Sequence, residues 1–154
     1  MTHLQRLLIA DGAFVTPAHV LEHLAVEQAK THPTGAPHSL YEELWHTDFW
    51  QRLMLSVIRG EPVAYPEHAA QSWPEDNDTL TEEAWQELIS RFLTALQRAA
   101  DAAGSGDLER VAGDKTVREQ LESVAGHNAY HFGRMVLLRQ LLGLWPPPSG
   151  GDTW

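Results

Sequence analysis

The sequence predicts an all-α protein: a four-helix bundle with a short extra helix after the first helix and a long crossover between helices two and three. Apolar side chains recur at spacings of three and four residues through most of the 154 positions. Capping-box patterns precede two of the long periodic segments. Alternating β-type runs joined by Asn-Gly or Asp-Gly turns are missing from the sequence. Long amphipathic helices with one long connection are typical of a four-helix bundle.

The first predicted helix covers residues 2–10 and ends at Asp11-Gly12, with an apolar stripe of Leu4, Leu7 and Leu8. A short helix begins near Pro17, because proline suits the first turn of a helix. Its apolar residues are Val20, Leu21 and Leu24. Residues 31–37 contain two prolines and a glycine, which predicts a connection.

The second long helix is predicted from Ser39, which has Glu42 three residues later in a capping box, to about Arg59. Residues 60–78 contain three prolines, so we expect a long surface crossover there. The third helix begins at Thr79 or Thr81, either of which can cap it, and ends at residues 104–106. Its apolar stripe is Trp85, Leu88, Ile89, Phe92, Leu96 and Ala99.

The fourth helix is predicted to begin at Thr116, which forms a capping box with Glu119, and to end at Gly143 before three prolines. Its apolar stripe comprises Leu121, Val124, Asn128, His131, Met135, Leu138 and Leu142. We therefore predict one bundle domain, residues 1–145, followed by a Pro/Gly-rich tail, residues 146–154.

Charge and composition exclude several classes of function. The formal net charge is −10, from 21 acidic and 11 basic residues, and an acidic surface without a Lys/Arg cluster in the sequence repels nucleic acid. The sequence contains no cysteine, which excludes disulfides and thiolate ligands. No stretch approaches the roughly 18 apolar residues of a membrane span, and the N-terminus does not resemble a signal peptide. We expect a cytoplasmic protein with no membrane or nucleic-acid partner.

The spacing of the histidines indicates the position of a candidate metal site. Two pairs, His19/His23 and His127/His131, have the i, i+4 spacing that places two ligands one helical turn apart. At about 100° per residue, His131 falls in the apolar stripe of the fourth helix with His127 beside it. A buried imidazole pair needs partners, and a metal ion provides them.

His46 is the third candidate ligand. On the second helix it lies on the apolar side with Phe49, Trp50, Leu53 and Val57, whereas Asp48, Arg52 and Arg59 fall on the far side. A core histidine bonded to a carbonyl or carboxylate is the simpler interpretation, but a second helix with an inward pair favours three converging imidazoles. The pair His19/His23 lies opposite Leu21 and Leu24, so we expect it to face solvent. The remaining histidines, His3, His32, His38 and His68, are expected on the surface.

Three segments together resemble the DinB/YfiT-like superfamily over nearly the whole chain. They are PHSLYEELWH at residues 37–46, HNAYHFGR at 127–134 and LRQLLGLWPP at 138–147. The resemblance implies a four-helix bundle with a divalent metal, often nickel or zinc, on His46, His127 and His131. It also implies a homodimer. Characterised relatives include transferases that use the thiols bacillithiol or mycothiol, a thiol-dependent isomerase and proteins described as metal-dependent hydrolases. Arg134 stands where the family often has glutamine.

Three neutral imidazoles leave coordination positions open, as in catalytic sites, and suit Zn, Ni, Fe and Cu, with Mn a further candidate. The leading hypothesis is a metal-dependent transferase or hydrolase that activates an external thiol or a water. The alternatives are a non-catalytic, stress-associated bundle that binds a metal, and a bundle with no physiological metal.

The sequence leaves the catalytic residues open, with three candidates beside the ligands. Glu42 lies one turn before His46 and is a possible base, although the capping box also accounts for it. Asn128 either lines the pocket or bridges helices. Arg134 either meets an anionic substrate or forms a surface ion pair. The aromatic residues Trp45, Trp50 and Tyr130 either shape a cavity or belong to the core.

Overall fold

Serine and threonine caps set where the long helices begin. In the computed structural model, which describes residues 1–10, 14–75 and 78–151, helix α4 spans Leu40–Arg59 after the Ser39 cap and helix α6 spans Val117–Leu141 after the Thr116 cap. Both predicted capping boxes are present. Helix α5 spans Glu82–Ser105, and of its two candidate caps Thr81 is the one that accepts from the helix backbone.

The shorter elements complete the chain. Helix α1 spans His3–Ile9, as predicted, and α2 spans Pro17–Leu21 with its proline in the first turn. They are followed by α3, Val26–Lys30, and by the 3₁₀ helix η1, Ala69–Ser72. Strands β1, Val111–Ala112, and β2, Lys115–Thr116, pair antiparallel just before α6.

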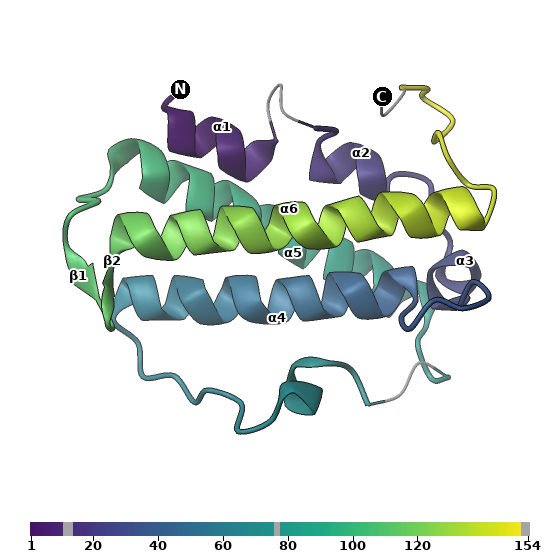
Figure 1. Ribbon diagram of the computed structural model, residues 1–154, viewed down its shortest axis with the longest axis horizontal. Helices are drawn as coiled ribbons and strands as arrows, with labels where there is room; N and C mark the ends of the chain where they lie inside the picture. Colours follow the sequence, from purple (N-terminus) through teal and green to yellow (C-terminus); the bar gives the residue numbers. More distant parts are fainter. Residues whose placement is uncertain (11–13, 76–77, 152–154) are drawn as a thin grey trace.

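The bundle consists of α1, α4, α5 and α6 packed together, which confirms the predicted fold class. Figure 1 shows α4 and α6 side by side and antiparallel, with α5 behind them and α1 above α6, where it packs against α5 and α6. The long crossover after α4 returns the chain along the length of the molecule, so that α5 runs in the same direction as α4. Within the described ranges, no helix has both the length and the apolar character of a membrane span.

Three short elements were not predicted: α3, η1 and the hairpin β1–β2. Single turns are too short to show a periodic pattern. The hairpin pairs Val111 with Thr116 and Ala112 with Lys115 around a Gly113-Asp114 turn. Gly113 has φ +70°, the left-handed region that favours glycine. Our expectation of no hairpin considered only Asn-Gly and Asp-Gly and missed the reversed dipeptide.

The short helix α2 ends earlier than predicted. His23 lies two residues beyond Leu21 with a left-handed φ of 52°, and Leu24 is buried outside the helix. The pair His19/His23 therefore does not lie on one helical face. His23 is exposed as predicted, whereas His19 is half-buried against the tail, where its Nδ1 lies 3.3 Å from the Ser149 hydroxyl.

The buried face of α4 also differs from the prediction. Asp48, placed on the solvent side by the helical wheel, is fully buried, whereas Phe49, Trp50 and Leu53 are only half-buried. Buried polar residues line the interior side of this helix: Glu43, Thr47, Asp48 and Gln51. Apolar periodicity failed here because the helix places polar groups toward its neighbours. Glu43, Asp48 and Gln51 pair with other helices, and the Thr47 hydroxyl donates to the Glu43 carbonyl one turn earlier in α4.

Arg139 joins the C-terminal segments to the bundle. Its guanidinium is buried and donates to the carbonyls of Val20 at 2.6 Å, Glu22 at 3.1 Å and Leu144 at 3.0 Å. It also lies over the Trp145 ring, 5.5 Å from the ring centre. One side chain therefore provides hydrogen bonds to carbonyl groups at the C-terminal end of α2 and in the turn after α6.

We expect Arg139→Ala to lower the free energy of unfolding by about 3 kcal/mol, because it leaves three carbonyls without their charged donor. Urea unfolding measures the change. The matched control is Arg118→Ala, whose exposed ion pair with Glu109 is worth at most about 1 kcal/mol. Equal effects of the two substitutions would contradict this structural role.

Candidate metal centre

Helices α4 and α6 bring three imidazoles together. His46 comes from α4, and His127 and His131 come from successive turns of α6. One ring nitrogen from each lies within 4.8 Å of the other two. The ring centres are 4.4–5.2 Å apart, His46 and His131 are buried, and His127 is half-buried. These are the three residues expected from the sequence, now placed at one point.

A backbone carbonyl fixes the orientation of His46. Its Nδ1 lies 2.8 Å from the carbonyl oxygen of Ser72, at the end of η1 in the crossover. A carbonyl only accepts hydrogen bonds, so Nδ1 carries the proton and Nε2 carries the free electron pair. That Nε2 lies 3.3 Å from Nε2 of His127. The crossover thus directs one imidazole lone pair into the cluster.

A buried carboxylate does the same for His131. Glu43 Oε2 accepts from His131 Nδ1 at 2.6 Å, which leaves Nε2 of His131 as the free ligand atom. The other carboxylate oxygen, Oε1, accepts from Arg134 Nε at 2.8 Å, and Arg134 Nη2 lies 2.7 Å from the same oxygen. Glu43 is completely buried, and the Arg134 guanidinium compensates its charge while His131 donates a hydrogen bond to it.

Trp73 covers one side of the cluster. Its ring stacks on His46 at 4.0 Å between ring centres and 12° between planes, and on His38 at 3.7 Å and 8°. The crossover therefore supplies both a carbonyl and an aromatic wall to the same imidazole. His38, expected to be a plain surface residue, forms the outer layer of this stack.

The environment keeps the imidazoles of His46 and His127 neutral. Burial lowers the pKa of His46 below its ordinary value of 6.5. Burial, together with the rings of His131 and His46, lowers the pKa of His127 to about 4. Both rings are therefore uncharged at neutral pH, which is the form that binds metals.

The donor set suits a divalent transition metal with open coordination positions. Three imidazole nitrogens meet here, and among the described residues no carboxylate joins the group as a fourth ligand. Two of the three rings are held through their other nitrogen, an arrangement typical of metal-binding histidines. Such a site has room for an exchangeable ligand.

The three residues proposed beside the ligands have different roles. Glu42 closes the capping box with Ser39 at 2.6 Å and lies 3.0 Å from the exposed His32, so it serves the helix end. Arg134 forms an ion pair, as one of its two interpretations predicted, but its partner is the buried Glu43 rather than a surface group. It also donates to the Tyr130 hydroxyl at 3.0 Å.

Asn128 combines its two interpretations. Its Nδ2 donates to Gln51 Oε1 at 2.8 Å, and Gln51 Nε2 donates to the Phe92 carbonyl at 3.0 Å. Because the Phe92 carbonyl can only accept, both amide orientations are fixed. Asn128 thus links α6 to α4 and, through Gln51, to α5. It also lines the cavity beside the cluster.

A cavity of about 240 Å³ adjoins His127 and offers space for a small substrate. Among the aromatic candidates, Trp50 lines this cavity, with Met54 and Val124 as further apolar walls. Trp45 stacks on Phe49 instead, and Tyr130 is 61% exposed. Only one of the three aromatic residues therefore shapes this cavity.

Sequence reasoning missed Glu43, Ser72 and Trp73. The signal for Glu43 was present: it lies three residues before His46, and the capping box already accounted for Glu42. Ser72 acts through its backbone, which carries no residue-type signal. Trp73 reaches the site only because the crossover folds back over α4.

Comparison with known protein families identifies the family of the chain. The model of the DinB superfamily matches residues 16–135, which include the three histidines and most of the chain. No curated protein and no solved structure matches the chain.

The depressed pKa values predict a pH dependence of stability. Between pH 6.5 and about 4 the unfolded chain binds a proton at His127 that the folded chain does not. The free energy of unfolding of the metal-free protein therefore falls as the pH drops through this range, and His46 adds in the same direction.

Urea unfolding at several pH values measures this dependence. Carboxylates titrate in the lower part of the range, so the comparison is with His127→Gln, which we expect to show a shallower slope. The exposed residue His3 gives the control His3→Gln, expected to retain the original slope. Identical slopes for all three proteins would contradict the assignment.

Proposed function

Because the chain belongs to the DinB superfamily, we propose that it is a metal-dependent transferase or hydrolase with a divalent ion on His46, His127 and His131. One observation carries the proposal. The Nδ1 hydrogen bonds of His46 and His131, to the Ser72 carbonyl and the Glu43 carboxylate, leave their Nε2 lone pairs free beside His127. Nickel and zinc are the metals we expect first, since three neutral imidazoles suit both.

A divalent ion at this point would lower the pKa of a coordinated water or thiol and so supply a nucleophile at neutral pH. The chain supports this chemistry with its own residues. Glu43 holds His131 and increases the basicity of its ring. Trp73 covers one face of His46 and excludes water from that side.

A thiol nucleophile has to come from outside, because the sequence has no cysteine. The 240 Å³ cavity beside His127 is the place for the second reactant. Its walls include Trp50, Met54 and Val124, which favour an electrophile with a small apolar group.

A non-catalytic metal-binding bundle is the second candidate. The cluster connects three segments, α4, α6 and the crossover, so a bound ion would hold them together. This alternative has the same metal site as the proposed enzyme, but the ion would stabilise the fold and would not catalyse a reaction.

Metal analysis tests the shared part. We expect protein purified without an affinity tag to contain about one divalent ion per chain, and each of His46→Ala, His127→Ala and His131→Ala to remove it. Glu43→Gln should weaken binding by about 10–100-fold, because it weakens the acceptor that orients His131. Mass spectrometry of the metals and competition with a chromophoric chelator measure both effects. His3→Ala is the control, and full metal content in His127→Ala would refute the site.

Activity distinguishes the two candidates. Metal-loaded protein is mixed with low-molecular-weight thiols and a panel of alkyl, epoxide and ester electrophiles, and thiol consumption and hydrolysis are followed. We expect turnover to fall at least about 100-fold in His127→Ala, because that variant lacks a ligand of the activating ion. His3→Ala should match the original protein. Equal rates in the presence and absence of His127 would exclude catalysis by this site.

A further inference from the structure

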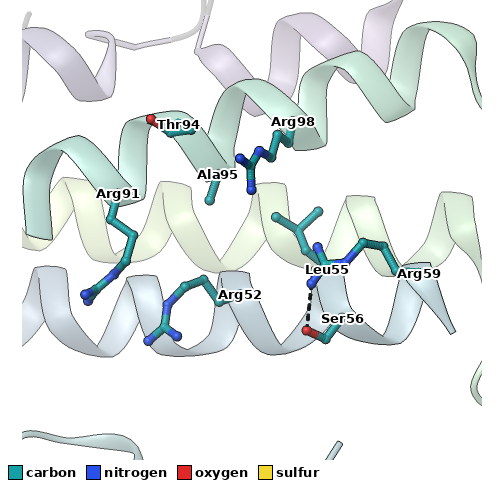
Figure 2. A pocket seen from close by; sticks show the side chains of 8 residues that line it. All are labelled: Arg52, Leu55, Ser56, Arg59, Arg91, Thr94, Ala95 and Arg98. Atoms are coloured by element: carbon teal, nitrogen blue, oxygen red, sulfur yellow. Dashed lines mark hydrogen bonds between the residues drawn. The ribbon is translucent and has the colours of Figure 1, made fainter. Parts of the chain in front are cut away.

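Four arginines line one groove between α4 and α5, away from the histidine cluster. Arg52 and Arg59 come from α4, and Arg91 and Arg98 come from α5. Figure 2 shows Arg91 and Arg98 extending from α5 toward α4, where the other two arise. The groove has a volume of about 320 Å³, and Leu55, Ser56, Thr94 and Ala95 complete its lining. We call it the arginine groove.

The groove is positive in a strongly acidic protein. The chain has 11 basic residues and a net charge of −10, yet four of the basic residues meet here. Two carboxylates pair with them, Asp48 and Glu61. Four guanidinium groups and these two carboxylates leave a local charge of 4 − 2 = +2. A concave positive region concentrates its field and attracts anions.

Asp48 holds one end of the groove in place. Its buried Oδ2 accepts from Arg52 Nε at 2.8 Å and from two nitrogens of Arg91 at 3.0 and 2.7 Å. One carboxylate thus fixes two guanidinium groups that would otherwise repel each other. Each guanidinium carries five N–H donors, so most of the donors of Arg52 remain available. The side chains are positioned before any ligand arrives, which reduces the entropy lost on binding.

At the other end of the groove, Arg59 is paired, whereas Arg98 has no ion-pair partner in the part of the chain that the structure describes. Arg59 donates to both oxygens of Glu61 at 2.6 and 2.7 Å and to the Ser56 hydroxyl at 2.9 Å. Among the described residues, no carboxylate forms an ion pair with Arg98. Asp101, one turn further along α5, accepts from Gln97 at 2.9 Å. Arg98 therefore supplies a full fork of donors to the groove.

We propose that the arginine groove binds the phosphoryl group of a small phosphorylated molecule, with Arg98 as its main anchor. A phosphate monoester carries about two negative charges at neutral pH, which matches the local charge of the groove. Guanidinium forks bind tetrahedral oxyanions through paired hydrogen bonds, and arginine is preferred for this purpose. The groove volume is at the lower end of small-molecule sites.

Inorganic phosphate and succinate are the probes, because both are mainly dianions at pH 8 but only phosphate is tetrahedral. Metal-loaded protein is titrated with each at constant ionic strength. Binding is followed by calorimetry and by the ¹H–¹⁵N correlation signals of the arginine Nε–H groups. We expect phosphate to bind at least tenfold more tightly than succinate and to shift the signals of the groove arginines.

Three variants localise the effect. Arg98→Gln should weaken phosphate binding at least tenfold while leaving thermal stability unchanged, because Arg98 makes no ion pair in the described structure. Arg118→Gln, which removes another exposed arginine, on α6, should bind phosphate like the original protein. His127→Ala should also bind normally, which separates the groove from any phosphate bound at the metal centre.

Four results would each overturn the proposal. They are equal affinity in Arg98→Gln and the original protein, an equal loss in Arg118→Gln, equal affinity for succinate and phosphate, and loss of phosphate binding in His127→Ala. The first two would indicate non-specific screening. The third would assign the groove to anions in general, and the fourth would place the phosphate at the histidines.

Discussion

The pairing of buried polar groups between helices is the constraint on which this fold depends. Helix α4 turns Glu43, Asp48 and Gln51 toward the interior, where an unpaired charge or amide is costly. Each is paired on another helix: Glu43 with His131 and Arg134 of α6, Asp48 with Arg91 of α5, and Gln51 with Asn128 of α6 and the Phe92 carbonyl of α5. These contacts fix how the helices are rotated against one another, because a shift of one residue would break all of them together. Apolar packing alone, around residues such as Trp85 and Phe92, tolerates small rotations more easily.

Much of the bundle could be predicted from local signals. The caps at Ser39, Thr81 and Thr116 carry their own sequence pattern, and the stripes of the long helices follow from spacing. The meeting of His46 with His127 and His131 was also within reach, because two helices each presented a polar residue on an inward face. What local signals missed depends on contacts between distant segments. The buried Asp48 pairs with Arg91, 43 residues later, and no periodicity in α4 contains that information.

The residues around the imidazoles also divide into those that local sequence signals predict and those that depend on distant segments. The ligands are side chains on regular helices, whereas their supports come from a carbonyl at Ser72 and a ring at Trp73 in an irregular segment. Glu43 lies on the same helix as His46 but supports His131 on the opposite helix. The rings of His46 and His131 are therefore each oriented by a different segment of the chain, so the site forms only when these segments pack together. The arginine groove, on a different side of α4, is likewise built by two helices.

The His38–Trp73–His46 stack has a thermodynamic consequence. The crossover contributes a carbonyl and an aromatic face to one imidazole, so the position of Ser72 and Trp73 and the rotamer of His46 stabilise each other. By linkage, the factor by which a ligand on the three histidines stabilises these crossover contacts equals the factor by which the contacts increase the affinity for that ligand. The crossover, which has three prolines and was predicted only as a connection, therefore contributes to the binding equilibrium of the three histidines.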